Sequence, residues 1–256
     1  MANQLNAWPA SVVVVIPVYR PAPTPDEAVA FARCLEILGR HPIVLVAPEG
    51  LALGAYTTGR IVGVERFAPG YFAGIAGYNR LLLDPRFYER FLAYRHLLIY
   101  QLDAFVFADR LAEWCAAGYD YVGAPWVGRS LLRVMLHICR TWPLARPRLR
   151  GLRNVVGNGG LSLRDVSAHL ESLALLGAKA RRWDINEDYF WSLYVRWRRP
   201  AFRIPDYRRA LAFAFETEPA ACLALNRGAL PFGCHGWDRH GRGFWRPIFR
   251  HFGYRI

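Results

Sequence analysis

Residues 12–18 read Val-Val-Val-Val-Ile-Pro-Val, a run in which six of the seven residues are β-branched. This composition is typical of a strand that is covered on both faces of a parallel sheet. Residues 42–47 form a second apolar run. Between the two runs, residues 26–38 place apolar side chains at helical spacing directly after Thr24-Pro25, a typical helix start. A strand, a helix and a second strand within about 40 residues predict the opening β-α-β unit of a nucleotide-binding type of sheet.

The rest of the chain continues this alternation of elements. We expect helices over residues 76–92, 111–117 and 165–176, and strands over 96–106, 119–124 and, after a glycine-rich turn, within 155–163. The first turn lacks Gly-x-Gly-x-x-Gly, which excludes the usual dinucleotide fingerprint. Because no internal repeat and no Ser/Gly linker divides the sequence, we predict one α/β domain with a Rossmann-like mixed, mostly parallel sheet flanked by helices.

Length and composition narrow the class further. The 256 residues, 54% of them hydrophobic, can form a substantial core and exclude a disordered chain. No apolar run approaches the roughly 20 residues that span a bilayer, and no charged n-region precedes an apolar one, so we expect neither a membrane span nor a standard signal peptide. The five cysteines contain no Cys-x-x-Cys pair. They predict free thiols in a reducing, cytoplasmic compartment.

Charge is unevenly distributed in this chain, whose net charge is +13. Residues 1–128 carry 10 Arg against 11 Asp and Glu, whereas residues 129–256 carry 23 Arg and Lys against 9 Asp and Glu. The asymmetry predicts an anionic partner, which could be a set of phosphates, a nucleic acid or an anionic membrane surface.

Two segments concentrate this positive charge. The segment 129–153 has seven Arg and no acidic residue, and its apolar positions do not follow one helical stripe. We expect it to be a mobile or surface-lying part of a basic insertion (127–153), which is either a flap over the donor site, a contact to an anionic membrane, or a solvated arginine-rich insertion. The segment 241–256 is basic and aromatic, and we expect it to be a tail outside a domain that spans residues 1–240.

Four polar features interrupt the apolar pattern, and each allows a functional and a structural interpretation. Asp103, near the end of a buried strand, could bind a cation that neutralises a diphosphate, or could cap a turn or pair with an arginine. Residues 157–160, Gly-Asn-Gly-Gly, could let the backbone approach a ligand, or form an ordinary loop. Glu187 and Asp188 could supply a general base, or stabilise a helix start. His235 could bind a ligand, or form structural hydrogen bonds.

The order of these features resembles a known layout. From the N-terminus the chain presents residues 16–20 (Ile-Pro-Val-Tyr-Arg), 78–80 (Tyr-Asn-Arg) and 101–103 (Gln-Leu-Asp), followed by the glycine turn, the acidic pair and His235. This order resembles the metal-dependent glycosyltransferases of GT-A fold and is similar to that of the β-1,4-galactosyltransferases. A closer resemblance is to a bacterial family of glycosyltransferase-like proteins known only as a domain of unknown function. It is carried by residues 99–107, 119–126, 156–164 and 231–237 and spans residues 10–240.

The resemblance implies a role for each matching position. Pro17, Tyr19 and Arg20 would contact the nucleotide, and Tyr78 and Arg80 would match the Phe and Arg of an F-N-R segment that lines the nucleotide pocket.

The metal-binding positions are implied in the same way. Asp103 would match the second aspartate of the D-x-D motif, and His235 the C-terminal metal ligand. Gln101 replaces the first aspartate, so it would contact the nucleotide without bringing a charge. The implied cofactor is a divalent cation, Mn²⁺ in preference to Mg²⁺, because Mn²⁺ better tolerates mixed carboxylate and imidazole ligands.

The acceptor side is implied by the remaining matches. Asn158, Gly159 and Gly160 would lie under the sugar or acceptor, together with Trp126. Glu187 would bind the acceptor, and Asp188 would be the catalytic base.

The resemblance therefore implies an inverting glycosyltransferase that takes a nucleotide-sugar donor, a UDP-sugar first of all, and a glycan, lipid-linked or cell-envelope acceptor. It would act in the cytoplasm, with peripheral contact to an anionic inner membrane face. Two alternatives stay open: a non-catalytic basic module that binds nucleic acid or an anionic membrane, and a degenerate transferase fold kept for sugar binding. No nucleic-acid-binding motif is present in the sequence, so we expect no specific nucleic acid partner.

Overall fold

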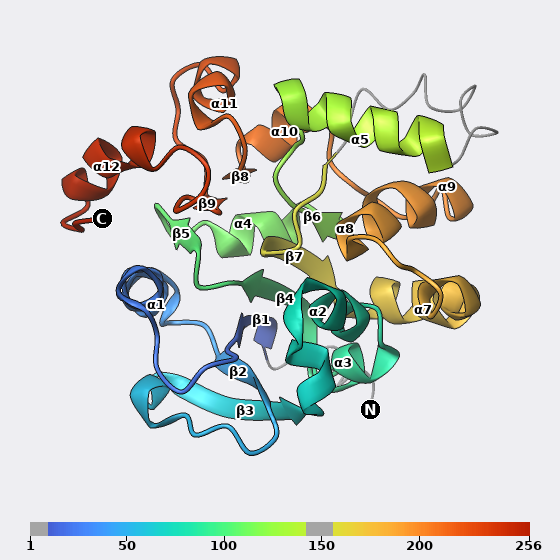
Figure 1. Cartoon of the computed structure of the whole chain (residues 1–256), viewed down its shortest axis with the longest axis horizontal. Coiled ribbons are helices and arrows are strands. Elements are labelled where there is room, and N and C mark those ends of the chain that lie inside the picture. The colour runs from blue at the N-terminus through green and yellow to red at the C-terminus, as the bar shows by residue number, and fades with distance from the viewer. Residues whose placement is uncertain (1–9, 142–155) are drawn as a thin grey trace, which may run out of the picture.

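The computed structural model describes residues 10–141 and 156–256, and its centre is a sheet of order β3-β2-β1-β4-β7-β6 (Figure 1). β1 pairs in parallel with β2 and β4, and β2 with β3, whereas β7 runs antiparallel to its neighbours β4 and β6. The predicted mixed, mostly parallel sheet is therefore confirmed. The strands are β1 (Ala10–Pro17), β2 (Ile43–Pro48), β3 (Ile61–Phe67), β4 (Tyr94–Tyr100), β6 (Tyr121–Val122) and β7 (Leu161–Asp165).

A smaller sheet of order β5-β9-β8 continues from the end of β4. It consists of β5 (Ala104–Val106), β8 (Ala214–Phe215) and β9 (Gly233–His235). β5 and β9 are antiparallel, with Ala104 opposite His235. The predicted strand over residues 96–106 is thus two strands, because the chain turns at Gln101–Asp103 and closes that turn with a hydrogen bond from Ala104 N to Gln101 O.

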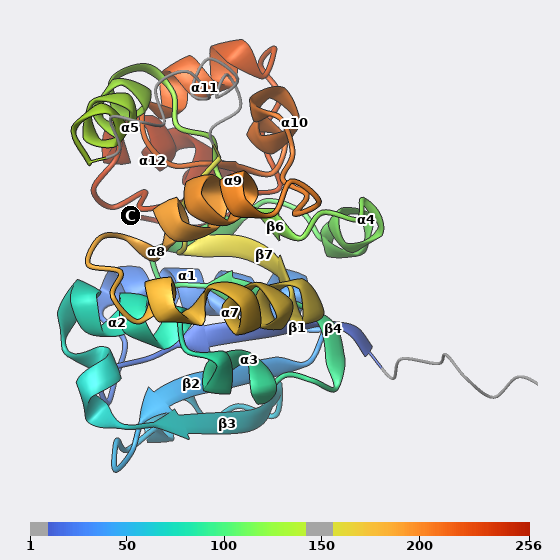
Figure 2. The same ribbon diagram turned by 90° about the vertical axis from the view of Figure 1, so that its right-hand side faces the viewer.

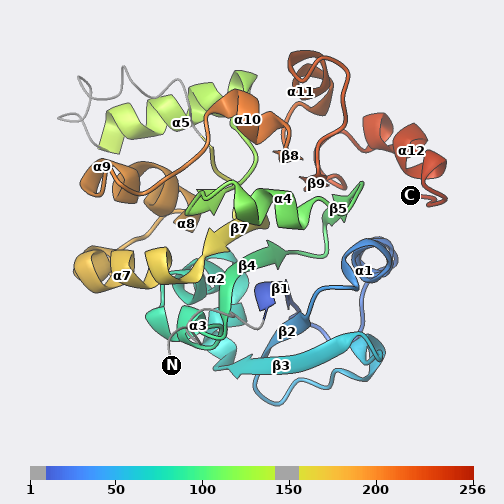
Figure 3. The same cartoon turned by 180° about the vertical axis from the view of Figure 1, so that it is seen from behind.

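Helices cover both faces of the large sheet, since alternate residues of a strand point to opposite sides. Val12, Val14 and Ile16 face α1 (Pro25–Leu38) and α4 (Leu111–Ala116). Val13 and Val15 face α2 (Gly74–Leu82), α3 (Pro85–Glu89) and α7 (Val166–Ala180). In Figure 2 α7 lies across the near side of the strands, and in Figure 3, seen from behind, α4 lies in front.

The remaining helices lie in the upper half of the molecule as drawn in Figure 1. They are α5 (Gly128–Thr141), α8 (Glu187–Tyr189), a π-helix (Phe190–Val195), α9 (Arg196–Arg198), α10 (Tyr207–Leu211), α11 (Pro219–Leu225) and α12 (Arg242–His251), and two short 3₁₀ turns lie at Gly54–Tyr56 and Pro69–Phe72.

Local sequence signals account for several of these boundaries. Thr24 and Glu27 form a capping box at the start of α1: Glu27 N donates to Thr24 Oγ1 (3.3 Å), and Thr24 N donates to Glu27 Oε2 (2.7 Å). The helix predicted over residues 76–92 is two helices, α2 and α3. Asp84 precedes Pro85, and a residue before proline disfavours helical backbone; its side chain caps the start of α3.

The segment 241–256 is not a tail, contrary to the prediction from its charge. It forms α12, whose Trp245 and Phe249 are fully buried. The ring of Phe249 stacks on Phe105 of β5 with centroids 4.0 Å apart, and Trp245 stacks on Phe107 at 5.8 Å. The many arginines of the segment made its apolar helix face hard to recognise in the sequence. Because α12 packs on β5, the domain includes this segment up to the C-terminal end of the described residues.

The basic segment 129–153 contributes the helix α5 up to Thr141, and its residues 142–153 lie outside the described part of the chain. Leu132, Met135 and Leu136 of α5 are exposed, as expected of a surface-lying element. Among the described helices none has the length and apolarity needed to cross a membrane. Cys34, Cys115, Cys222 and Cys234 are free and buried.

Packing of α12 onto β5 makes a testable prediction. Phe249→Ala would leave a cavity in a fully buried aromatic cluster, so we expect the free energy of unfolding to fall by about 3–5 kcal/mol in urea titrations. The neighbouring Arg250→Ala, on the exposed side of the same helix, serves as the control and should change it by less than about 0.5 kcal/mol. Equal unfolding midpoints for the two variants would contradict the placement of α12 in the core.

Candidate active site

A cavity of about 720 Å³ opens at the carboxyl ends of β1 and β4. This edge of an α/β sheet is where ligands commonly bind, and the volume suits a small-molecule substrate. Most of the residues implied by the sequence resemblance line it: Pro17, Tyr19, Arg20, Tyr78, Gln101, Asp103, Asn158, Gly159, Gly160, Glu187, Asp188 and His235. Elements far apart in the chain thus converge on one place.

Arg80 is an exception, and the structure places it away from this cavity. It is exposed, donates to Gly70 O (3.3 Å) and lines a second cavity of about 560 Å³. Successive residues of a helix point about 100° apart, so Tyr78 and Arg80 diverge on α2. The neighbour Asn79 faces the first cavity instead, and its Oδ1 accepts a hydrogen bond from Glu187 N (3.3 Å).

Trp126 does not line the cavity either. Its buried indole lies under the glycine turn, where a Cβ on Gly157 would collide with it, and its ring meets Tyr189 edge-on with centroids 5.0 Å apart. Trp126 therefore supports the floor of the site.

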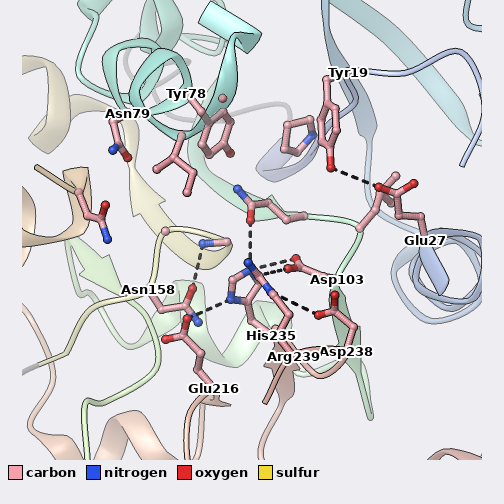
Figure 4. Close-up of a pocket in the computed structure, with 18 of the residues that line it drawn as sticks. Tyr19, Glu27, Tyr78, Asn79, Asp103, Asn158, Glu216, His235, Asp238 and Arg239 are labelled. Atoms are coloured by element: carbon pink, nitrogen blue, oxygen red, sulfur yellow. Dashed lines mark hydrogen bonds and ion pairs between the residues drawn. The ribbon is translucent and has the colours of Figure 1, made fainter. Parts of the chain in front are cut away.

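Asp103 and His235 form the centre of the cavity (Figure 4). The register of β5 against β9 brings them together, and Gly236 N donates to Asp103 O (2.9 Å). His235 Nε2 lies 2.9 Å from Asp103 Oδ1 and 3.0 Å from Gln101 Oε1. The predicted proximity of Asp103 and His235, which are about 130 residues apart in sequence, is confirmed.

Two further charged residues complete this cluster and were not predicted. Glu216, which follows β8, places Oε1 3.4 Å from His235 Nδ1. Arg239 Nη2 lies 2.5 Å from Asp103 Oδ2. Glu216 stands after a two-residue strand and Arg239 among several arginines, so no sequence pattern distinguished either of them.

The cluster shifts the acid–base properties of both central residues. Burial by itself would lower the pKa of His235, but the carboxylates of Asp103 and Glu216 raise it to about 10. Burial would raise the pKa of Asp103, but His235 and Arg239 lower it to about 2. The imidazolium and the carboxylate therefore form an ion pair at neutral pH.

The donor atoms here fit a divalent cation that is shared with a substrate. Asp103 supplies a carboxylate and Gln101 an amide oxygen, and one oxygen of each lies within 3.0 Å of the imidazole nitrogen His235 Nε2, which could act as a ligand once it loses its proton. No cluster of three His, Cys, Asp or Glu side chains with metal-ligand geometry occurs in the described part of the chain. Mg²⁺ and Mn²⁺ sites with one or two carboxylates and substrate phosphates need no such cluster.

Asp188 is a second type of reactive group in the cavity. Its Oδ2 accepts a hydrogen bond from Asn158 N (3.0 Å) and its Oδ1 from Tyr189 N (2.9 Å). Burial and the neighbouring Glu187 carboxylate raise its pKa to about 7, against the opposing effect of these two N–H groups. A carboxylate with a pKa near neutrality can accept a proton and release it again at physiological pH.

Glu187 faces the sheet and is held there. Its carboxylate pairs with Arg164 of β7, with Nη2 2.8 Å from Oε1, and both side chains are buried. Arg164 also donates to Ser162 Oγ (3.0 Å) and to Tyr88 Oη (2.9 Å). Binding of an acceptor by Glu187 stays a prediction.

The glycine turn 157–160 connects these two groups of residues. Asn158 has a φ of 71°, a left-handed conformation that Asn tolerates better than most residues. A Cβ on Gly159 would collide with Glu187, and one on Gly160 with His235. The glycines are therefore required by close packing, and Asn158 Nδ2 is left as a buried donor without a partner among the described residues.

Glu27 fixes the loop after β1. The sequence indicates that Glu27 lies in the first turn of α1, but it gives no sign that this side chain also contacts the site. Tyr19 Oη donates to Glu27 Oε1 (3.3 Å), and Arg20 Nη1 lies 3.7 Å from Glu27 Oε2. The guanidinium of Arg20 also lies over the Tyr19 ring, 4.9 Å from its centroid. One carboxylate thus holds two of the side chains that are expected to contact a nucleotide.

The fold defines a class. It is the GT-A fold of glycosyltransferases, and the solved structure of mouse xyloside xylosyltransferase 1 matches it at a TM-score of 0.51 and 14% identity, covering 88% of this chain and 97% of that one. A glycosyltransferase involved in the glycosylation of the major capsid of PBCV-1 matches at a TM-score of 0.50 and 11% identity, covering 95% and 99%. At such identities the likeness concerns the fold alone.

Within this class the chain belongs to a named family. The sequence model of DUF5672, a family described as "Protein of unknown function", matches residues 61–235. No curated protein matches the chain.

The raised pKa of Asp188 makes a prediction about stability. A carboxyl group that titrates near pH 3.8 when unfolded and near pH 7 when folded stabilises the protein at low pH, and this contribution disappears as the pH rises from about 4 to 7. Asp188→Asn should therefore be more stable than the wild type at pH 8, by at most about 4 kcal/mol, and equally stable near pH 4.

Urea titrations at pH 4, 6 and 8 measure this difference. The control is Asp184→Asn, an exposed position four residues earlier. A destabilised Asp188→Asn variant at pH 8 would show that the carboxylate is needed for folding and that its pKa is not raised.

Proposed function

We propose that the protein is a glycosyltransferase that moves a sugar from a nucleotide-diphosphate donor to a hydroxyl group of a glycan or cell-envelope acceptor. The observation that carries the proposal is that one cavity, at the carboxyl edge of a GT-A sheet, contains both a set of cationic side chains (Arg20 and Arg239) and a carboxylate that can act as a base. The first can bind a leaving diphosphate, and the second can activate an acceptor.

The chemistry uses few groups. Asp188 takes the proton of the acceptor hydroxyl, and the acceptor oxygen forms the new bond to the anomeric carbon of the sugar. The bond from that carbon to the diphosphate breaks, and the leaving group takes the electron pair. Arg20 and Arg239 both line the cavity and can stabilise the charge that develops on the phosphates. Attack from the side opposite the diphosphate would invert the configuration.

A divalent cation, Mn²⁺ in preference to Mg²⁺, would be held by Asp103, Gln101 and His235 in its neutral form, so binding of the cation would release the His235 proton, and it would neutralise the diphosphate. Among the described residues, acidic side chains line the cavity in excess of basic ones: Asp26, Glu27, Asp103, Glu187, Asp188, Glu216 and Asp238, against Arg20, Arg239 and His235. A diphosphate entering this cavity needs additional positive charge, which supports the cofactor.

The donor side of the proposal rests on the loop after β1. Tyr19 is exposed at the rim and can contact a nucleobase, and Arg20 beside it can reach a phosphate. UDP is the first nucleotide to test. The buried free thiols are consistent with action in the cytoplasm.

The cation requirement can be tested without any acceptor. We expect UDP or GDP to raise the melting temperature of the wild type in the presence of Mn²⁺ and much less in EDTA, because the cation bridges protein and diphosphate. Asp103→Asn should lose most of the Mn²⁺-dependent shift, while Asp184→Asn should keep it. The same shift in Mn²⁺ and EDTA would contradict the metal site, and the absence of any nucleotide-induced shift would contradict the donor class.

Removal of the base tests the catalytic assignment. Asp188→Asn should lower kcat by about 100-fold or more, because the proton acceptor acts in the transition state, while nucleotide binding stays intact. The wild-type rate should rise with pH and level off above about pH 7, where Asp188 is ionised. The measurement is donor turnover by nucleotide release, with Asp184→Asn as control. A folded Asp188→Asn variant with near-wild-type turnover would refute the assignment.

A further inference from the structure

The second cavity, of about 560 Å³, is separate from the candidate active site. The helix α2 contributes to both: Tyr78 and Asn79 line the candidate active site, and Arg80 lines the second cavity. The described residues that line the two cavities have no member in common. A ligand of the second cavity would therefore be additional to any substrate of the first.

Three arginines line the second cavity: Arg80 of α2, Arg86 of α3 and Arg181 at the C-terminal end of α7. Arg86 is neutralised by Asp84, the one acidic residue among the described residues of this lining, with Nη2 2.7 Å from Oδ2. Arg80 donates to a backbone carbonyl, Gly70 O (3.3 Å). Neither Arg80 nor Arg181 forms an ion pair with a described residue. The lining therefore carries two positive charges that no described carboxylate neutralises.

The backbone at the end of α7 opposes this charge only in part. Gly177 and Ala180, which also line the cavity, belong to the last turn of α7, and the carbonyl groups there carry about half a negative charge. Two guanidinium groups outweigh that charge. The exposed side chains of Lys179 and Arg182, on either side of Ala180 and Arg181, add positive charge at the same end of the helix. The cavity should therefore attract anions.

Charge and size indicate which kind of anion fits. Two unpaired positive charges match a phosphate monoester, whose charge at neutral pH is about −1.5 to −2. A guanidinium group can bind phosphate oxygens through two parallel N–H groups. The cavity is much larger than one phosphate group, and the buried side chains of Leu83, Leu173 and Ala180 make part of its lining apolar. An organic group attached to the phosphate can occupy this apolar part.

We propose that the second cavity binds a small organic phosphate, whose phosphate group contacts Arg80 and Arg181 and whose organic part lies against Leu83 and Leu173. Arg86 remains paired with Asp84 and borders the site. The proposal does not rest on the proposed function, because it uses no residue of the first cavity. It also gives a role to Arg80, the residue of the Tyr-Asn-Arg segment that the candidate active site leaves unused.

Isothermal titration calorimetry of the full-length protein with phenyl phosphate tests the proposal. EDTA is present, so that binding does not depend on a metal ion. We expect Arg80→Ala and Arg181→Ala each to weaken binding about tenfold or more, because each variant removes a charged hydrogen-bond donor. Arg181→Lys keeps the charge but not the paired N–H groups, so it should weaken binding less than Arg181→Ala.

The matched control is Arg182→Ala. Arg182 is the exposed arginine next to Arg181, and it is not among the described residues that line the cavity. This variant should bind phenyl phosphate like the wild type. Since Arg80 and Arg181 are exposed, we expect all of these variants to melt at the wild-type temperature, and a thermal melt of each checks that it is folded.

Four outcomes would overturn the proposal. The first is no binding at millimolar phenyl phosphate, and the second is equal affinity in Arg80→Ala, Arg181→Ala and Arg182→Ala. The third is loss of binding in Arg20→Ala/Arg239→Ala alone, which would place the phosphate in the first cavity. The fourth is binding of inorganic phosphate as tight as that of phenyl phosphate, which would show that the apolar lining takes no part. None of these titrations measures turnover, so their failure leaves the test of Asp188 unaffected.

Discussion

The buried ion pair of Arg164 and Glu187 is the constraint on which the site depends. Neither charge is accessible to water, so each must stay with its partner, and removing one would leave the other uncompensated at a cost of several kcal/mol. Arg164 is fixed in β7 by Ser162 and Tyr88. The pair therefore ties the start of α8 to β7, an inner strand of the sheet, and it determines where the next residue, Asp188, can lie. An acid that only stabilises a helix start can stay in solvent, whereas Glu187 is buried.

The same pair explains why two adjacent acids have different properties. Both carboxylate oxygens of Glu187 accept hydrogen bonds from the guanidinium of Arg164, whereas the Asp188 carboxylate accepts hydrogen bonds from two backbone N–H groups. Burial acts on Asp188, and the fixed carboxylate of Glu187 adds to it, so the pKa of Asp188 rises to about 7. Glu187 thus fixes the start of α8 through Arg164, and its charge raises the pKa of Asp188. The interpretation of both acids as simple helix-start stabilisers does not account for the buried arginine.

How much the sequence could predict depends on the range of the interactions. The β-α-β opening and the cap at Thr24 follow from local patterns, and both are present. The pairing of Asp103 with His235 spans about 130 residues, so only the family resemblance indicated it. The prediction that Arg80 lines the nucleotide pocket was wrong, because a sequence motif does not specify the direction in which each helical side chain points. Glu216 and Arg239 carry no local signal. Residues 241–256 did carry one, since Trp245 and Phe249 are four residues apart on one helix face, but their arginines concealed it.

Net charge is a poor guide to what this cavity binds. The chain carries +13, yet in the part of it that the structure describes seven acidic side chains line the cavity against two arginines and one histidine. Two of the acids, Asp103 and Glu216, lie against His235, and the first of them also pairs with Arg239, so much of the local positive charge is already neutralised. A diphosphate that draws Arg239 away from Asp103 would leave that carboxylate with His235 as its charged partner. Arg129, the one arginine of segment 129–153 whose side chain the structure describes, is not among the residues that line the cavity. The net charge of the chain therefore does not predict the balance of charge among the described residues of its site.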